Sequence, residues 1–121
     1  MSTYNGEKFI REQLDSILAQ TYKNIEIVVR DDGSKDNTVS IVKEYMQKNS
    51  NITLYEGENL GFIKSFFELL TLVEADYYSY ADQDDVWMEN KIELAVNSLN
   101  EFIDKIRKDG TFDSIVGKYY A

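Results

Sequence analysis

Residues 25–34 read Ile-Glu-Ile-Val-Val-Arg-Asp-Asp-Gly-Ser, and this stretch decides the fold. The run from Ile25 to Val29 is too short for a helix and is rich in β-branched residues, which predicts a buried strand. The strand should end at Asp31-Asp32-Gly33-Ser34, because these residues favour turns. A helix is expected from about Asp36 to Lys48, so the stretch predicts a strand followed directly by a helix.

The alternation of helix and strand continues on both sides of this stretch. Helical spacing of apolar residues predicts a helix from residue 7 to about 20, and short strands are expected at Ile52 to Tyr55 and at Tyr77 to Ala81. A further helix should open at Asn59-Leu60-Gly61, and a long one should run from about Met88 to Arg107. The apolar residues expected to face inward on the four helices are Ile10, Leu14, Ile17, Leu18; Val39, Val42, Met46; Ile63, Phe66, Phe67, Leu70, Val73; and Ile92, Ala95, Leu99, Phe102, Ile106.

Repetition of strand and helix at about 25-residue spacing is typical of parallel βαβ units joined by right-handed crossovers. The expected fold class is therefore α/β, a parallel, Rossmann-like sheet with flanking helices, in one domain spanning residues 1–121. No strand pattern precedes the first helix, and Ser2 to Gly6 reads as a loop. We therefore expect the sheet to lack its usual first strand through truncation.

The composition limits the available chemistry. There is no cysteine and no histidine, so disulfides and zinc-thiolate sites are excluded and the commonest general base is absent. Any metal should be a hard cation held by carboxylates and phosphates. The net charge of −9 repels polyanions and argues against nucleic acid as a partner. No basic region followed by an apolar one opens the chain, so we expect a cytoplasmic protein, with attachment to the inner membrane face as a further option.

Two acidic clusters are expected where strands end. Asp31-Asp32 follows the strand at Ile25 to Val29, and Asp82-Gln83-Asp84-Asp85 follows the strand at Tyr77 to Ala81. Ligands of open parallel sheets bind at the carboxyl ends of the strands, and carboxylates gathered there repel one another unless a cation compensates. This pattern indicates a divalent-ion site. Turn and helix-cap chemistry is the alternative, and it is stronger for the first cluster than for the second.

A third segment, Asn59-Leu60-Gly61, lies at another expected strand-to-helix junction. It is either a simple helix entry or part of the same site. Lys64 follows one turn later. Its ammonium group is either an exposed solubilising charge or a counter-charge for a phosphate at the start of the helix.

Several of these segments, in this order, resemble family-2 glycosyltransferases of the GT-A type. The resemblance rests on Ser2-Thr3-Tyr4-Asn5-Gly6, Gln13 to Tyr22, Ile25 to Thr38, Asn59-Leu60-Gly61 and Ala81-Asp82-Gln83-Asp84-Asp85-Val86-Trp87, and it extends from residue 2 to about 95. Several motifs in the right order are far more specific than a lone Asp-x-Asp. The last segment is similar to bacterial enzymes that make rhamnose-containing or other surface polysaccharides, which is an analogy only.

The resemblance implies roles for individual residues. The Thr3-Tyr4 loop and Asp32 would contact the base, and Asn59 would belong to the nucleotide site. Asp82 would lie near the ribose, and Asp84 would ligate a Mn²⁺ or Mg²⁺ ion that bridges the two phosphates. The ligand would be a UDP- or dTDP-sugar and the acceptor an unidentified glycan.

The sequence departs from the family pattern at both ends. Family members have an apolar strand directly before Ser-x-Tyr-Asn, where this chain has only Met1. The acceptor-binding half and the catalytic base lie beyond the Asp-x-Asp, so we expect the base outside this chain and leave Glu101, Asp104 and Asp113 unassigned. An exposed sheet edge or apolar groove would favour a homodimer.

Two other functions compete with a transferase. One is a non-catalytic nucleotide-binding or interaction fragment. The other is a response-regulator receiver, which is also acidic, α/β and Mg²⁺-dependent. The receiver pattern fits poorly, because the strand at Ile52 to Tyr55 ends in Glu56-Gly57 and Lys105 falls in the middle of a helix.

Overall fold

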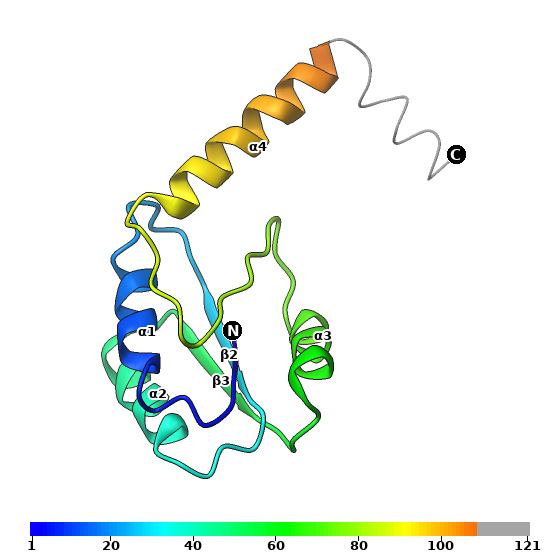
Figure 1. Ribbon diagram of the computed structural model, residues 1–121. Helices are drawn as coiled ribbons and strands as arrows, with labels where there is room; N and C mark the ends of the chain where they lie inside the picture. Colours follow the sequence, from blue (N-terminus) through cyan, green and yellow to red (C-terminus); the bar gives the residue numbers. More distant parts are fainter. Residues whose placement is uncertain (109–121) are drawn as a thin grey trace.

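The computed structural model describes residues 1–108 and consists of a parallel sheet between two layers of helices (Figure 1). The strands are β1 (Ser2–Thr3), β2 (Ile27–Asp31) and β3 (Ile52–Glu56), and the helices are α1 (Ile10–Leu18), α2 (Thr38–Lys48), α3 (Phe62–Leu72) and α4 (Lys91–Lys108). Helices α1 and α2 lie on one side of the sheet and α3 on the other, while α4 projects away from it. The α/β class is confirmed.

The sheet has the order β1-β2-β3, and both pairs of strands are parallel. Ser2 is in register with Arg30, and Ile27 is in register with Ile52. On the other side of β1, Ser2 forms a single parallel bridge with Asp82. The chain segments that follow all these positions therefore leave the sheet at the same edge.

The hydrophobic core lies between the sheet and the pair α1 and α2. Leu14, Val29 and Val42 are fully buried, and each comes from a different one of these elements. Trp87, from the segment before α4, is 8% exposed and packs against the same core. The remaining buried apolar members of the cluster are Met1, Ile10, Ile17, Ile27, Ile41, Ile52 and Ala81.

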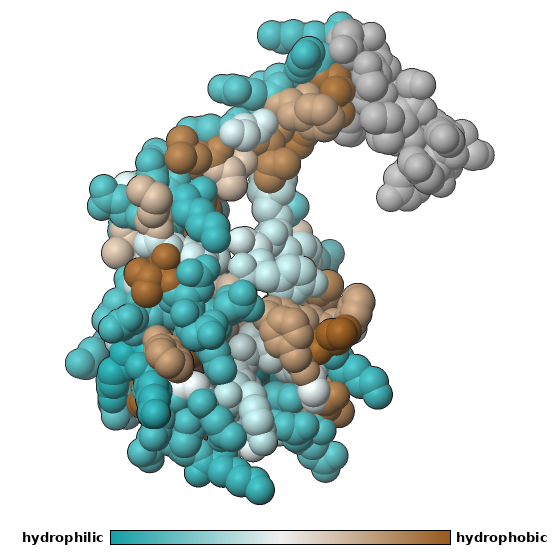
Figure 2. All heavy atoms as spheres, in the orientation of Figure 1, coloured by the Kyte–Doolittle hydropathy of each residue, from teal (hydrophilic) through white to brown (hydrophobic). Residues whose placement is uncertain are grey.

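Two expectations about strands are corrected. Ser2 and Thr3, expected in a loop, form β1, which is too short to leave a period-2 pattern. Tyr77 to Ala81, expected to be a strand, does not form one, and the isolated bridge between Ser2 and Asp82 comes directly after it. A cavity of about 460 Å³ is lined both by this segment and by Asn24 to Val28, and no backbone hydrogen bond joins the two within residues 1–108. Figure 2 shows the hollow beneath the base of α4.

The expected inner faces of α3 and α4 are also corrected. In α3 the buried residues are Ser65 and Leu69, whereas Ile63 and Phe67 are both 66% exposed. Helix α4 has no buried residue within the range that the structure describes, and Phe102 is 57% exposed. Apolar periodicity gives the phase of a stripe but does not show which neighbour covers it. None of the helices in residues 1–108 is long and apolar enough to cross a membrane.

The amino group of Met1 is expected to make stability depend on pH. It donates to the Val28 carbonyl oxygen at 2.6 Å inside the sheet, and burial lowers its pKa from 8.0 to about 6. Between pH 6 and 8 the unfolded chain holds the proton and the folded chain does not, so stability rises with pH. A shift of this size corresponds to about 2 to 3 kcal/mol between pH 5 and 9.

Urea unfolding at several pH values measures this effect in a protein that starts at Met1. No histidine or cysteine titrates in the same range, so the window is clear of side chains with ordinary pKa values. The matched control is the N-acetylated protein, in which the rise between pH 6 and 8 should disappear. An equal rise in both proteins would show that another group causes it.

Candidate functional site

Four loops meet at the carboxyl edge of the sheet. The loop after β1 bonds to the acidic segment after the bridge, because the Tyr4 N–H donates to Gln83 Oε1 (2.8 Å) and Gln83 Nε2 donates to the Tyr4 carbonyl oxygen (3.0 Å). The same loop bonds to the turn after β2 through the Asn5 N–H and Ser34 Oγ (2.8 Å). A Cβ on Gly6 would lie 2.7 Å from Gln83 Cδ, so a larger residue at this position would displace the Gln83 side chain.

Asp31 shapes the turn after β2. One carboxylate oxygen accepts hydrogen bonds from the Thr3 hydroxyl (2.9 Å) and the Ser34 hydroxyl (2.6 Å), and the other accepts from the backbone N–H groups of Gly33 (3.1 Å) and Ser34 (2.8 Å). Asp31 is 3% exposed. Gly33 has φ 84°, a conformation that favours glycine. Turn chemistry therefore accounts for this aspartate.

Asp32 is directed to the loop after β3. Its Oδ1 accepts from Arg30 (2.6 Å) and from the Leu60 N–H (2.9 Å), and its Oδ2 accepts from the Gly61 N–H (3.0 Å). A carboxylate has about four acceptor positions, so one on Oδ2 remains after these three bonds. Asp32 thus accepts hydrogen bonds from the two backbone N–H groups directly before α3.

Arg30 is buried at the centre of this edge. Its Nη1 donates to Asp32 and to Ser65 Oγ (3.0 Å), its Nη2 donates to the Glu58 carbonyl oxygen (3.1 Å), and its Nε donates to the Glu68 carboxylate. The side chains of Arg30 and Asp32 are each 4% exposed, whereas that of Glu68 is 45% exposed. Three elements, β2, the loop after β3 and α3, are therefore joined by one guanidinium group.

Asp82 and Asp84 are exposed on the fourth loop. The Asp82 backbone is held from α1, because Gln13 Nε2 donates to its carbonyl oxygen (2.8 Å). Within residues 1–108 neither carboxylate has a protein partner, and no group of three or more acidic, histidine or cysteine side chains is arranged to hold a metal. One or two free carboxylates are nevertheless the usual protein share of a Mg²⁺ site that also uses substrate phosphates. The donors present therefore fit such an ion.

The other predicted site residues differ in how they are placed. Thr3 is 1% exposed with its hydroxyl committed to Asp31, while the Tyr4 ring is 45% exposed at the edge. Asn59 is exposed, and its backbone nitrogen would lie 3.3 Å from a Cβ on Gly33, so it borders the turn after β2. Lys64 is exposed on the first turn of α3, with no partner among the described residues.

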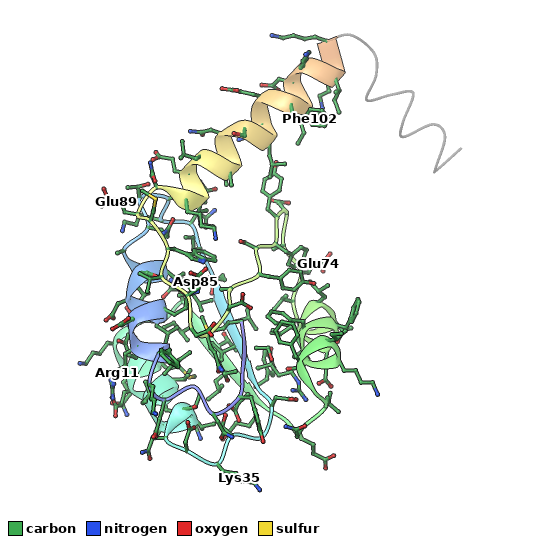
Figure 3. All side chains as sticks on the ribbon, in the orientation of Figure 1. Arg11, Lys35, Glu74, Asp85, Glu89 and Phe102 are labelled. Carbon is green, nitrogen blue, oxygen red and sulfur yellow. The ribbon has the colours of Figure 1, made fainter. Side chains whose placement is uncertain are left out.

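Asp85 does not cap α4. It lies six residues before Lys91, and its Oδ1 accepts from the neighbouring Val86 N–H (2.9 Å). Figure 3 shows Asp85 on the segment that passes between α1 and α3. The start of α4 is instead bonded to the segment that follows α1, because the Ile92 N–H donates to Gln20 Oε1 (3.0 Å).

Sequence reasoning missed the polar residues that hold these loops in place. Gln13 anchors the acidic segment to α1, Gln20 anchors the start of α4 to the segment after α1, and Arg30 joins three elements. Each interrupts or ends an otherwise apolar pattern. A polar residue that is buried must form hydrogen bonds. A polar residue within an apolar pattern is therefore the feature of the sequence from which these anchoring residues could have been predicted.

Comparison with known proteins matches these features to one family. The sequence profile described as Glycosyl transferase family 2 matches residues 1–119. An uncharacterised glycosyltransferase of Rickettsia typhi is 42% identical over 102 residues, which are 84% of this chain and 31% of that protein. The dTDP-rhamnosyl transferase RfbG of Shigella flexneri is 40% identical over 105 residues, which are 82% of this chain and 36% of RfbG. The chain thus spans about a third of the length of these relatives.

Solved structures of TarS from Staphylococcus aureus have the same fold. TarS residues 1–349 in complex with UDP match with a TM-score of 0.76 and 32% identity, over 83% of this chain and 30% of the TarS chain. The complex of the same TarS fragment with UDP-GlcNAc matches with a TM-score of 0.70 and 34% identity. This likeness confirms the expected GT-A-type fold. Because the family profile covers nearly the whole sequence and the fold agrees, the chain belongs to glycosyl transferase family 2.

Proposed function

We propose that the carboxyl edge of the sheet binds a nucleoside diphosphate sugar together with Mn²⁺ or Mg²⁺, as the donor site of a glycosyltransferase. The main support for this proposal is that four loops meet at this edge. Two of these loops contain carboxylates that differ in burial and in hydrogen bonding. Asp32 is buried and nearly saturated with hydrogen bonds, whereas Asp84 is exposed and free among residues 1–108. A base and a metal-bound diphosphate need these two different environments.

The base would be held by the loop after β1 and by Asp32. The exposed Tyr4 ring offers an apolar face, and the remaining acceptor position on Asp32 Oδ2 suits a ring N–H of uracil or thymine. Thr3 would act indirectly by fixing the turn, and Asn59 would border the base. Relatives bind or use both kinds of nucleotide, since TarS is crystallised with UDP-GlcNAc and RfbG is a dTDP-rhamnosyl transferase.

The diphosphate would lie beside the Asp82-Gln83-Asp84 segment. Asp84 would ligate the ion and Asp82 would face the ribose. A divalent ion there would neutralise the charge that grows on the leaving diphosphate as the sugar bond breaks. Lys64 would interact with phosphate charge from the exposed first turn of α3.

Membership of the family removes the receiver alternative but leaves the non-catalytic one to be tested. The metal requirement and the turnover are separate measurements. Donor binding with no acceptor-dependent product, in an assay with candidate glycan acceptors, would identify this 121-residue chain as a binding unit. A transferase in its own right would form product at an ordinary enzyme rate, about 1 s⁻¹ or faster.

The binding experiment is calorimetry with UDP and with dTDP, each in Mn²⁺ and in EDTA. We expect weak binding in Mn²⁺ and none in EDTA, because a protein of net charge −9 repels a second anion without a bridging cation. A matched titration with uridine, which lacks phosphates, should be insensitive to EDTA. Equal affinity for UDP in Mn²⁺ and EDTA would contradict the metal bridge.

A further inference from the structure

The guanidinium group of Arg30 bonds the carboxylate of Asp32, which we propose contacts the base. Both side chains are buried. Arg30 Nη1 and the Leu60 N–H both donate to Asp32 Oδ1, and the Gly61 N–H donates to Oδ2. The carboxylate is thus held at both oxygens. Arg30 therefore helps to orient the Asp32 carboxylate, and with it the acceptor position that remains on Oδ2.

Arg30 also fixes the loop that contains Asn59. Its Nη2 donates to the Glu58 carbonyl oxygen on one side of Asn59, and through Asp32 it is linked to the Leu60 N–H on the other side. The guanidinium packs directly on this loop, since a Cβ on Gly57 would lie 2.8 Å from Arg30 Cζ. Both flanks of Asn59 therefore depend on one side chain.

The guanidinium is itself held from the α3 side. Ser65 Oγ accepts from Arg30 Nη1 at 3.0 Å and shares a hydrogen bond with the Ser2 hydroxyl, and Glu68 accepts from Arg30 Nε. A planar group with its donors engaged on three elements has little freedom to turn. Lysine offers one compact ammonium group and cannot reproduce this set of bonds.

We infer that Arg30 is a positioning residue for nucleotide recognition: it acts through Asp32 and the Glu58–Gly61 loop to place the groups that meet the base. This inference rests on the proposed donor site, because it assigns no contact between Arg30 and the ligand. The proposed positioning role of Arg30 differs from a general stabilising role in one respect. The effect of Arg30 on affinity passes through Asp32, so the two residues should not act independently.

A double-mutant cycle tests this dependence. The variants are Arg30→Lys, Asp32→Asn and the pair, and the measurement is the affinity for UDP in Mn²⁺. Each single variant should bind about tenfold more weakly, and the pair should lose no more than about threefold beyond Asp32→Asn alone. Independent contributions would multiply to about a hundredfold loss and would overturn the inference.

Amide hydrogen exchange separates local positioning from loss of overall stability. In Arg30→Lys the exchange of the Leu60 and Gly61 amides should accelerate at least about tenfold more than that of the buried Val42 amide in α2, because local opening of the loop adds to any loss of overall stability. Arg11→Lys is the matched control, since Arg11 pairs with Glu44 at the exposed surface. Equal acceleration at Val42, or unchanged Leu60 and Gly61, would overturn the inference.

Failure of the proposed function gives a different result. If the parent protein does not bind UDP or dTDP in Mn²⁺, the donor site is wrong and Arg30 positions no base contact. The exchange rates at Leu60 and Gly61 would still show whether Arg30 holds the loop, because that measurement uses no ligand.

Discussion

The Asp84→Asn substitution is expected to abolish metal-dependent binding of UDP or dTDP and to leave the fold intact. Asparagine keeps the shape of the side chain but removes the charge that a divalent ion requires. Asp84 is exposed and has no partner among residues 1–108, so the substitution breaks no hydrogen bond there. Calorimetry with Mn²⁺ measures the affinity, and circular dichroism and thermal melting check the fold.

Asp85→Asn is the matched control for this experiment. It makes the same change of charge one residue away, at a side chain that bonds the Val86 N–H and faces solvent. We expect binding to weaken by less than about threefold, through the loss of one nearby negative charge. If Asp85→Asn abolished binding and Asp84→Asn did not, the metal ligand would be displaced by one residue from our assignment.

The second large effect is expected on stability, from Arg30→Met. Removing one partner of a buried ion pair typically costs about 3 to 5 kcal/mol, because the other charge remains buried without compensation. Here Asp32 would keep its two backbone donors, but Ser65 and the Glu58 carbonyl oxygen would lose theirs. For a chain of this size, the melting temperature should fall by on the order of 10 to 20 °C.

Arg11→Met is the control for the stability measurement. Arg11 also bonds a carboxylate, Glu44, at 2.8 Å, but both side chains are more than half exposed. An exposed pair gains little because water solvates the separated charges equally well, so we expect almost no change in melting temperature. A similar fall in melting temperature in the two variants would indicate that burial of the ion pair does not cause the loss of stability in Arg30→Met.

The structure gives a physical reason for one of the motifs in the sequence. Gln13 on α1 and Gln20, two residues after its end, donate through their side-chain amides to the carbonyl oxygens of Asp82 and Met88, and the Trp87 N–H donates to Ser16 Oγ at 3.0 Å. These bonds hold the acidic segment against α1. They place it beside the end of β1, where no regular strand leads into it.

Local patterns were sufficient for much of the fold. The run from Ile25 to Val29 and the turn after it predicted β2, which the structure places at Ile27–Asp31, and periodicity predicted the existence of all four helices. Because parallel strands leave a sheet at one edge, the sequence could also predict that Asp32, Asn59 and Asp82 would meet. These properties depend on side-chain period and turn chemistry, which a short window contains.

The tertiary structure alone decided which faces are covered and which polar groups are shared. The phase of α3 is set by Ser65, which bonds Ser2 and Arg30, and this contact turns Phe67 outward. The same network divides the acidic pair, with Asp31 shaping a turn and Asp32 bound to Arg30 and the loop before α3. Adjacent, chemically identical carboxylates cannot be distinguished in sequence, because their roles depend on donors about 30 residues away that only folding brings near.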